Sequence, residues 1–164
     1  MIARIIATVF YSGYLKPAPG TWGTLAALPL GWLVAYWTGF FGFVLATVIA
    51  FGVGYWATGE ETKGKEDHDP GEIVIDELVG VWIALLPVVY GASSMGADLL
   101  ALYPGWIAAF LLFRLFDIWK PGPIGWADRR GGPMGVMLDD VIAGVFSAIG
   151  VIALAALFHL VILI

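Results

Sequence analysis

The 164-residue sequence has no cysteine and few charged residues. Without cysteine, the chain can form no disulfide, no thiolate metal site and no cysteine nucleophile. Charged residues make up 13% of the chain, compared with about 25% in soluble domains. Acidic residues outnumber basic ones and the formal net charge is −5, which argues against nucleic acid as a partner.

Hydrophobic residues fill the chain in place of charge. They account for 60% of the sequence, and the mean hydropathy is +0.90. A soluble domain of this length cannot hide so much apolar surface from water, so lipid must be its solvent. We therefore predict an all-α fold, an integral membrane helical bundle, with residues 1–164 forming a single domain.

The apolar runs predict about five spanning helices. No Asp, Glu, Lys or Arg occurs from Pro17 to Thr58, a stretch too long for one crossing, and we expect a break near Thr38-Gly39. The stretch Met1–Tyr14 is too short to span and is expected to be an interfacial or re-entrant helix. The predicted spans are Trp22–Trp37, Phe40–Thr58, Ile73–Tyr90, Leu99–Trp119 and Val136–Ile164.

The connecting segments predict the orientation. Glu60–Glu72 and Gly122–Gly135 are separated by two spans and therefore share one side of the membrane. The connections near Gly39 and at Gly91–Asp98 lie on the other side and contain no Lys or Arg. Basic residues favour the cytoplasmic side, so the two polar segments are expected there.

This orientation gathers six charged side chains in one layer near the cytoplasmic boundary. Ionisable groups inside a bilayer cost free energy, and carboxylates close together repel one another, so a cation should neutralise them. Oxygen ligands without cysteine suit a hard ion such as Mg²⁺. The alternative for each acidic pair is a solvated helix start. The six residues are Asp76, Glu77, Arg114, Asp117, Asp139 and Asp140.

Several nearby residues suit a phosphate group. Arg114 and Asp117 share a helix face, where they form either an ion pair or part of a site. Lys120, Arg129 and Arg130 flank a glycine-rich segment and either anchor the chain to anionic lipid or bind phosphate. The segment 19–24 (PGTWGT) opens a helix whose free N–H groups attract anions, and Thr21 can cap it.

Three sequence blocks resemble the phosphatidylglycerophosphatase A family of bacterial membrane phosphatases. The resemblance extends from Pro19 to about Ser147. The first block is PGTWGT, and the second runs from Asp69 through IVIDELVG, ending at Gly80. The third comprises FRLFDIWKPGPI at 113–124, the pair Asp128-Arg129 and GVMLDD at 135–140. The resemblance assigns no role to His68, Asp69 or Arg130.

The resemblance implies an enzyme of the bacterial inner membrane whose active site faces the cytoplasm. Its implied activity is Mg²⁺-dependent hydrolysis of phosphatidylglycerol phosphate to phosphatidylglycerol and inorganic phosphate. We expect direct attack by metal-activated water, with a phospho-aspartate intermediate as the alternative. The expected metal ligands are Asp76, Glu77, Asp139 and Asp140. The expected phosphate-binding residues are Arg114, Lys120, Arg129 and Thr21, and the expected catalytic residues are Asp117, Asp128 and Asp76.

Other functions are compatible with the residues alone. The substrate could be another lipid or polyprenyl phosphate. A cation or proton transporter would also place carboxylates in a membrane, but transport sites are expected near the midplane. A non-catalytic lipid-binding protein would leave the four carboxylates unexplained. The oligomeric state does not follow from the sequence.

Overall fold

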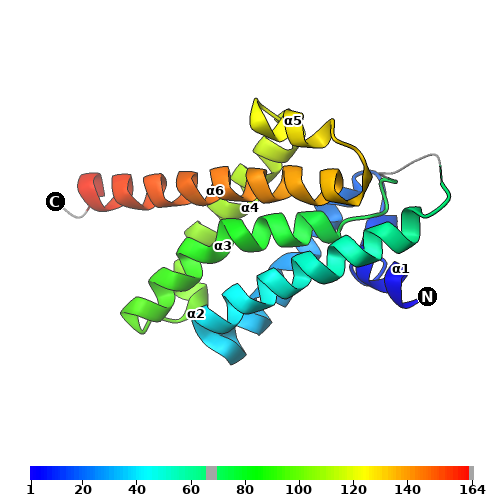
Figure 1. The fold of residues 1–164 in the computed structure, drawn as a ribbon. Helices are drawn as coiled ribbons and strands as arrows, with labels where there is room; N and C mark the ends of the chain where they lie inside the picture. The colour runs from blue at the N-terminus through cyan, green and yellow to red at the C-terminus, as the bar shows by residue number, and fades with distance from the viewer. Residues whose placement is uncertain (66–69, 163–164) are drawn as a thin grey trace.

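The structure, a computed structural model, describes residues 1–65 and 70–162 and is a helical bundle (Figure 1). No strand occurs among these residues, which confirms the predicted all-α class. Four helices are long and apolar enough to cross a membrane. They are α2 (Pro19–Thr62), α3 (Ile75–Met95), α4 (Tyr103–Trp119), which the short η2 (Leu99–Leu102) precedes, and α6 (Gly132–Ile162).

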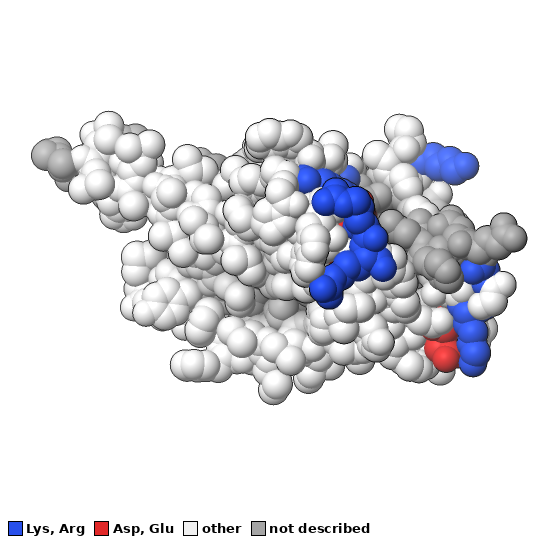
Figure 2. Space-filling view, turned by 45° about the horizontal axis from the view of Figure 1, so that its top comes forward, with Lys and Arg blue, Asp and Glu red and all other residues white. Residues whose placement is uncertain are grey.

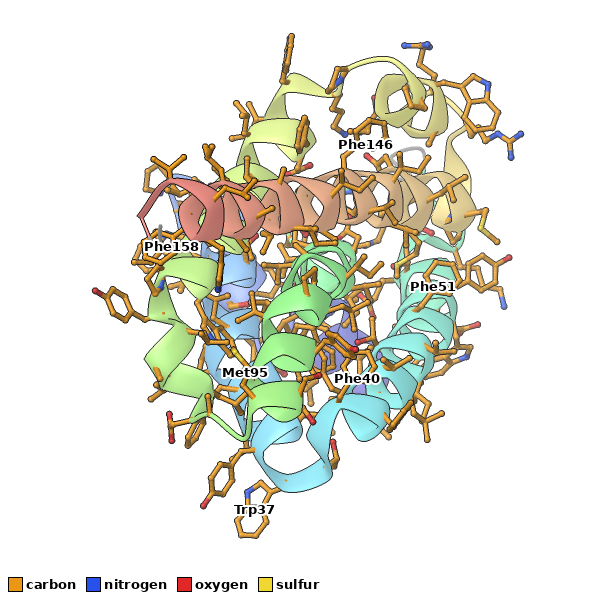
Figure 3. All side chains as sticks on the ribbon, turned by 90° about the vertical axis from the view of Figure 1, so that its left-hand side faces the viewer. Trp37, Phe40, Phe51, Met95, Phe146 and Phe158 are labelled. Atoms are coloured by element: carbon orange, nitrogen blue, oxygen red, sulfur yellow. The ribbon has the colours of Figure 1, made fainter. Side chains whose placement is uncertain are left out.

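The long helix α2 is two arms joined at Gly39. Gly39 has φ +66° and ψ −170°, a conformation that essentially only glycine adopts. The chain turns back there, so α2 forms a V, and Trp37 and Phe40 lie at its bend (Figure 3). The predicted break near Thr38-Gly39 is therefore confirmed. Five predicted crossings correspond to four helices because two of them join in α2.

Helix α3 lies at the centre of the bundle. In its most apolar 18-residue stretch, 56% of the residues are buried, compared with 17–22% in the corresponding stretches of the other three long helices. It packs against α2, α4 and α6. Large apolar side chains such as Leu45, Leu111 and Ile152 are exposed on the outer helices. The exposed apolar surface is the face that a lipid-embedded bundle presents to acyl chains.

The polar connections gather at one end of the bundle, as the orientation argument requires. The start of α3, the start of α6 and the end of α2 lie together there, and the bend of α2 lies at the other end with the α3–η2 connection (Figure 1). Helix α6 begins at Gly132, one turn before the predicted start. The segment predicted as an irregular loop contains a six-residue helix, α5 (Pro123–Asp128).

The N-terminal segment packs onto this polar end. Its helix α1 (Ile2–Ala7) has six residues, too few to span a membrane, and η1 (Ser12–Tyr14) follows. The Val74 amide donates a hydrogen bond of 2.8 Å to the Ala7 carbonyl. A Cβ atom on Gly13 would overlap the Glu72 carbonyl, so the backbones touch. These contacts fix the segment that leads into α3.

Candidate active site

A pocket of about 280 Å³ opens at the polar end of the bundle, between the starts of α2, α3 and α6 and the end of α4. Segments far apart in sequence contribute to it because all of these helix ends meet in the same layer. Its charged lining consists of five carboxylates and two cations. These are Asp76, Glu77, Asp117, Asp139 and Asp140, with Arg114 and Lys120.

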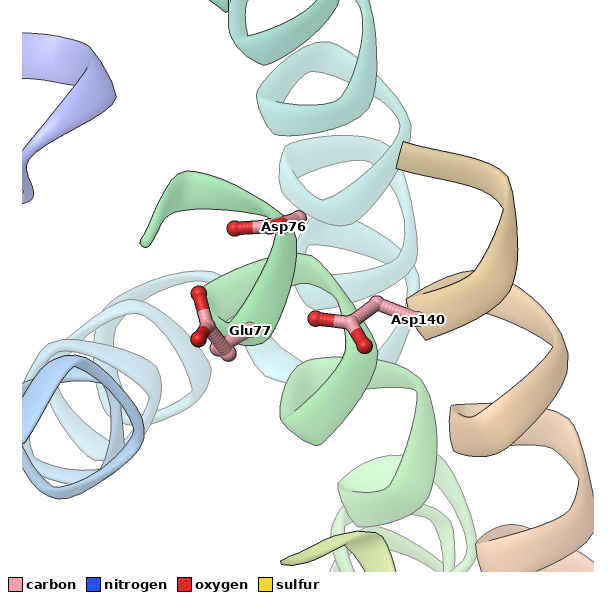
Figure 4. A group of neighbouring side chains, drawn as sticks. All are labelled: Asp76, Glu77 and Asp140. Carbon is pink, nitrogen blue, oxygen red and sulfur yellow. The ribbon is translucent and has the colours of Figure 1, made fainter. Parts of the chain in front are cut away.

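Three of the carboxylates form a compact group. Asp76 and Glu77 lie in the first turn of α3, and Asp140 reaches toward them from α6 (Figure 4). One oxygen from each lies within 4.8 Å of the others. Acidic side chains in a first helical turn are favoured by the helix dipole, which partly explains Asp76 and Glu77. It does not explain Asp140, in the third turn of α6.

This group fits a divalent cation. Asp140 is 2% exposed, and Oε2 of Glu77 is buried without a hydrogen-bond partner among the described residues. Buried carboxylates are normally paired or bound to a metal, because an uncompensated buried charge is costly. All the donors are oxygens, the ligand type that Mg²⁺ prefers. Asp76, Glu77 and Asp140 are therefore the residues that could hold such an ion.

Asp139, predicted as a fourth metal ligand, has a different partner. Its Oδ2 accepts a hydrogen bond of 2.8 Å from Lys120 Nζ, and the same ammonium also binds Asp128. Although burial alone lowers the pKa of Lys120, its bonds to Asp128 and Asp139 raise that pKa above its usual value. Lys120 therefore stays positive. Asp139 lines the pocket beside the three-carboxylate group but is not part of it.

Arg114 connects the acidic group to α4 and α2. Its Nη1 lies 2.5 Å from Oδ2 of Asp117, one helical turn away, and 3.9 Å from Oε1 of Glu77. The ion pair expected from the i,i+3 spacing is therefore present, and it lies in the pocket. A Cβ atom on Gly20 would overlap Glu77 Oε1 and would lie 3.1 Å from Arg114 Nη1. Glycine at this position lets the start of α2 approach both side chains.

The remaining predicted residues do not line the pocket. Thr21 lies in the first turn of α2, next to the lining residue Gly20. Asp128 and Arg129 are exposed at the end of α5. Asp128 binds the lining residue Lys120, and the Arg129 guanidinium packs on Gly125 beside the Lys120 carbonyl. His68 and Asp69 lie outside the described residues.

The backbone of the predicted anion-attracting helix start lines the pocket, but sequence reasoning missed the other backbone segment, before α3. Ala18, Pro19 and Gly20 line the pocket, and so do Gly71 and Ile73 before α3. Thr24 does not cap the helix start and instead donates a hydrogen bond to the Gly20 carbonyl within α2. It is the glycine that allows the close approach.

The fold and the pocket define a membrane-embedded helical protein with an acid-rich polar site at one end. The chain belongs to the Phosphatidylglycerophosphatase A family, whose profile matches residues 5–155. The family name describes a phosphatase, and the chain is accordingly a phosphoric monoester hydrolase.

Curated relatives agree with the family assignment. The chain is 36% identical to "Phosphatidylglycerophosphatase A" of Escherichia coli, over 88% of this chain and 78% of the relative. It is 40% identical to the protein of the same name in Haemophilus influenzae, over 92% and 87%. A Bacteroides thetaiotaomicron protein, named as a candidate phosphatidylinositol-3-phosphatase, is 41% identical over 88% of each chain. No solved structure matches significantly.

Proposed function

We propose that this chain hydrolyses phosphatidylglycerol phosphate to phosphatidylglycerol and inorganic phosphate with the help of Mg²⁺. We place the reaction at the cytoplasmic face of a bacterial inner membrane. One observation carries the proposal: a three-carboxylate group and Arg114 line the same pocket at the polar end of a lipid-embedded bundle. A phospholipid carries its phosphate at this depth, and two relatives bear the name of this activity.

In the proposed site, Asp76, Glu77 and Asp140 hold the cation. When bound, Mg²⁺ would offset the negative charge that builds up on the phosphoryl oxygens during transfer. The three side chains come from α3 and α6, which pack closely along the bundle. Rigid helices keep the ligand oxygens in place, so little reorganisation is needed when the substrate arrives.

The terminal phosphate binds on the α2 and α4 side of the pocket. Arg114 supplies a planar guanidinium, whose Nε has no hydrogen-bond partner among the described residues. The first turn of α2 adds the N–H groups of Gly20 and Thr21, which have no intrahelical acceptor. Thr21 therefore contributes through its backbone. Lys120 adds positive charge from the pocket wall.

The remaining acids orient these groups and accept a proton. Asp117 Oδ2 holds Arg114 through the 2.5 Å hydrogen bond, and Asp117 lines the pocket. We assign to the Asp117 carboxylate the acceptance of the proton from the attacking water. Asp139 and Asp128 act through Lys120, which they hold at the rim.

The Bacteroides thetaiotaomicron relative is named for phosphatidylinositol 3-phosphate, so this lipid is the second candidate substrate. The test measures phosphate release by the purified protein in detergent micelles, with Mg²⁺ or with chelator. The substrates are phosphatidylglycerol phosphate, phosphatidylinositol 3-phosphate and a polyprenyl phosphate. We expect the highest kcat/KM for phosphatidylglycerol phosphate and none without a divalent cation. A preference for either other lipid would replace the proposed substrate, and full turnover in chelator would remove Mg²⁺ from the mechanism.

A further inference from the structure

We infer that Arg129, at the rim of the pocket, binds a second phosphate of the substrate, the diester that joins the glycerol headgroup to the lipid. The inference rests on the proposed function, because phosphatidylglycerol phosphate carries a diester phosphate and a terminal monoester phosphate separated by one glycerol unit. The pocket takes the terminal phosphate, and the rim takes the diester. Arg129 is then a residue that determines specificity.

The first observation is that the pocket itself is a poor place for a second anion. Its lining has five carboxylates and two cations, and both cations already bind carboxylates. A diester phosphate in the pocket would meet uncompensated negative charge at short range, which is strongly unfavourable. We therefore place the diester outside the pocket, at its rim.

The second observation is that Arg129 is a cation with no acidic partner among the described residues. Arg4 pairs with Glu61, Arg114 pairs with Asp117, and Lys120 pairs with Asp128 and Asp139. Neither Arg129 nor its neighbour Arg130 forms an ion pair with a residue that the structure describes, and both are exposed. Lys and Arg side chains gather on the surface to which α5 contributes, with little acidic surface visible beside them (Figure 2).

The third observation is that α5 is tied to the pocket. Asp128, the residue before Arg129, binds the ammonium of the pocket-lining Lys120. A Cβ atom on Gly125 would lie 2.7 Å from the Lys120 carbonyl oxygen and 3.3 Å from Nη1 of Arg129, so both groups pack on the same glycine. The guanidinium of Arg129 is therefore held beside the backbone of a residue in the pocket wall.

The neighbouring residues suit the lipid interface. Trp126 is half exposed, and the guanidinium of Arg130 lies 4.1 Å from the centroid of its ring. A partly exposed indole is typical of the headgroup layer of a membrane. The stacking draws Arg130 to Trp126, which leaves Arg129 as the free guanidinium nearest the rim. Arginine suits this role because its planar fork can donate two hydrogen bonds to one phosphate group.

Lys16 is the rival residue. It is exposed and lies two positions before the lining residue Ala18, so it also approaches the rim. Within residues 1–65 and 70–162, no hydrogen bond or ion pair joins Lys16 to a residue of the pocket wall, whereas Arg129 packs on Gly125 beside the Lys120 carbonyl and follows Asp128, which binds Lys120. We therefore assign the diester to Arg129, and the test includes Lys16.

The experiment separates the two phosphates by using the two reaction products as inhibitors. Dihexanoylphosphatidylglycerol carries only the diester, and inorganic phosphate stands in for the terminal group. We expect Arg129→Ala to raise the inhibition constant of the short-chain lipid about tenfold, the loss expected for one charge-assisted contact. The inhibition constant of inorganic phosphate should stay unchanged. Lys63→Ala, which removes an exposed cation from the same end of the protein, is the matched control and should change neither value.

Three outcomes would overturn the inference. A raised inhibition constant for inorganic phosphate in Arg129→Ala would place Arg129 on the terminal phosphate. If Arg129→Ala changes neither inhibition constant, Arg129 contacts only bulk anionic lipid and does not bind the substrate. A larger lipid effect in Lys16→Ala would move the diester to the other side of the rim. Calorimetric binding of the short-chain lipid to the variants gives the same comparison without turnover. Absence of turnover by the unaltered chain therefore counts against the proposed function alone.

Discussion

Nζ of Lys120 lies 2.8 Å from Oδ2 of Asp139 and also binds Asp128. One lysine at the end of α4 therefore joins α5 and α6, and it does so at the wall of the pocket. Lys120 has a left-handed backbone conformation, with φ +47°, which ends α4 and turns its side chain toward both carboxylates. Lys120 therefore both neutralises the two carboxylates and holds α4, α5 and α6 together.

Replacing Lys120 with methionine should destabilise the protein. Asp139 has a side chain only 7% exposed, and it would lose its charged partner. We expect the free energy of unfolding to fall by roughly 1–3 kcal/mol. Denaturant titration in micelles measures this value. Asp128→Asn is the control, because the Asp128 side chain is 37% exposed and its ion pair should contribute less than about 1 kcal/mol.

The effect of Lys120→Met should depend on pH in one direction. The pKa of Lys120 is raised in the folded protein. The stabilisation is therefore complete below the unfolded pKa and is lost as pH rises through the folded one. The difference between the two proteins should therefore persist up to about pH 9, below the ordinary pKa of lysine. A difference that disappears as pH rises across this range would contradict the ion-pair account.

Asp140→Asn should weaken Mg²⁺ binding, so that a higher Mg²⁺ concentration is needed for activity. The substitution keeps the shape of the side chain and removes a charged ligand from the three-carboxylate group. Substitutions around metal ligands typically cost about 10–100-fold in metal affinity, and a ligand itself should cost at least as much. The Mg²⁺ concentration for half-maximal activity gives the comparison. Asp139→Asn should shift this concentration less, because Asp139 is paired with Lys120.

Asp98→Asn is the matched control for the metal experiment. Asp98 lies before η2, away from the pocket lining, and accepts a hydrogen bond from the Leu100 amide that asparagine can also accept. It should leave the Mg²⁺ dependence unchanged. Equal effects of the Asp140 and Asp98 substitutions would remove Asp140 from the proposed metal site.

Gly20→Ala should impair the site without unfolding the protein. The new Cβ atom would collide with Oε1 of Glu77 and crowd the Arg114 guanidinium, so both side chains must move. A displacement at the reacting centre should lower kcat/KM by about tenfold or more. Gly52→Ala is the control, since a Cβ there meets nothing within 4 Å. Wild-type kcat/KM in a folded Gly20→Ala protein would show that the start of α2 is no part of the site.

The orientation can be tested with single cysteines, because the chain has none of its own. Lys65→Cys lies at the polar end, after α2, and Ser94→Cys lies near the end of α3. We expect an impermeant thiol reagent added to intact cells to label Ser94→Cys and to spare Lys65→Cys. The reverse pattern would place the pocket on the outer face, opposite to the positive-inside expectation.

The sequence predicted the bundle well because the relevant signals are local. Apolar length defines the spans, and Gly39 marks the bend without any tertiary information. The sequence also predicted that Asp76, Arg114 and Asp140 lie in one layer. Consecutive spans run in opposite directions, so the start of one helix and the end of its neighbour lie at the same membrane face. This prediction requires only the order of the spans.

Apart from the Arg114–Asp117 pair, which the i,i+3 spacing predicts, the pairing of charges within that layer did not follow from the sequence. Asp139 and Asp140 are adjacent, but a helix rotates about 100° per residue, so one can join the carboxylate group while the other meets Lys120. Which residue does so depends on how α6 is rotated against α3. The backbone contacts of Gly13 and Gly20 likewise depend on tertiary packing. Helix α5 was missed because its six residues are too few for a periodic pattern.

The most direct test of the central claim is phosphate release from phosphatidylglycerol phosphate by the purified, folded protein in Mg²⁺-containing micelles. The unaltered chain should release one inorganic phosphate for each phosphatidylglycerol formed. Release should stop with chelator, return with excess Mg²⁺, and be strongly reduced in Asp140→Asn at the same Mg²⁺ concentration. A folded protein that releases no phosphate from this lipid, or releases it equally well in chelator and in Asp140→Asn, would contradict the account.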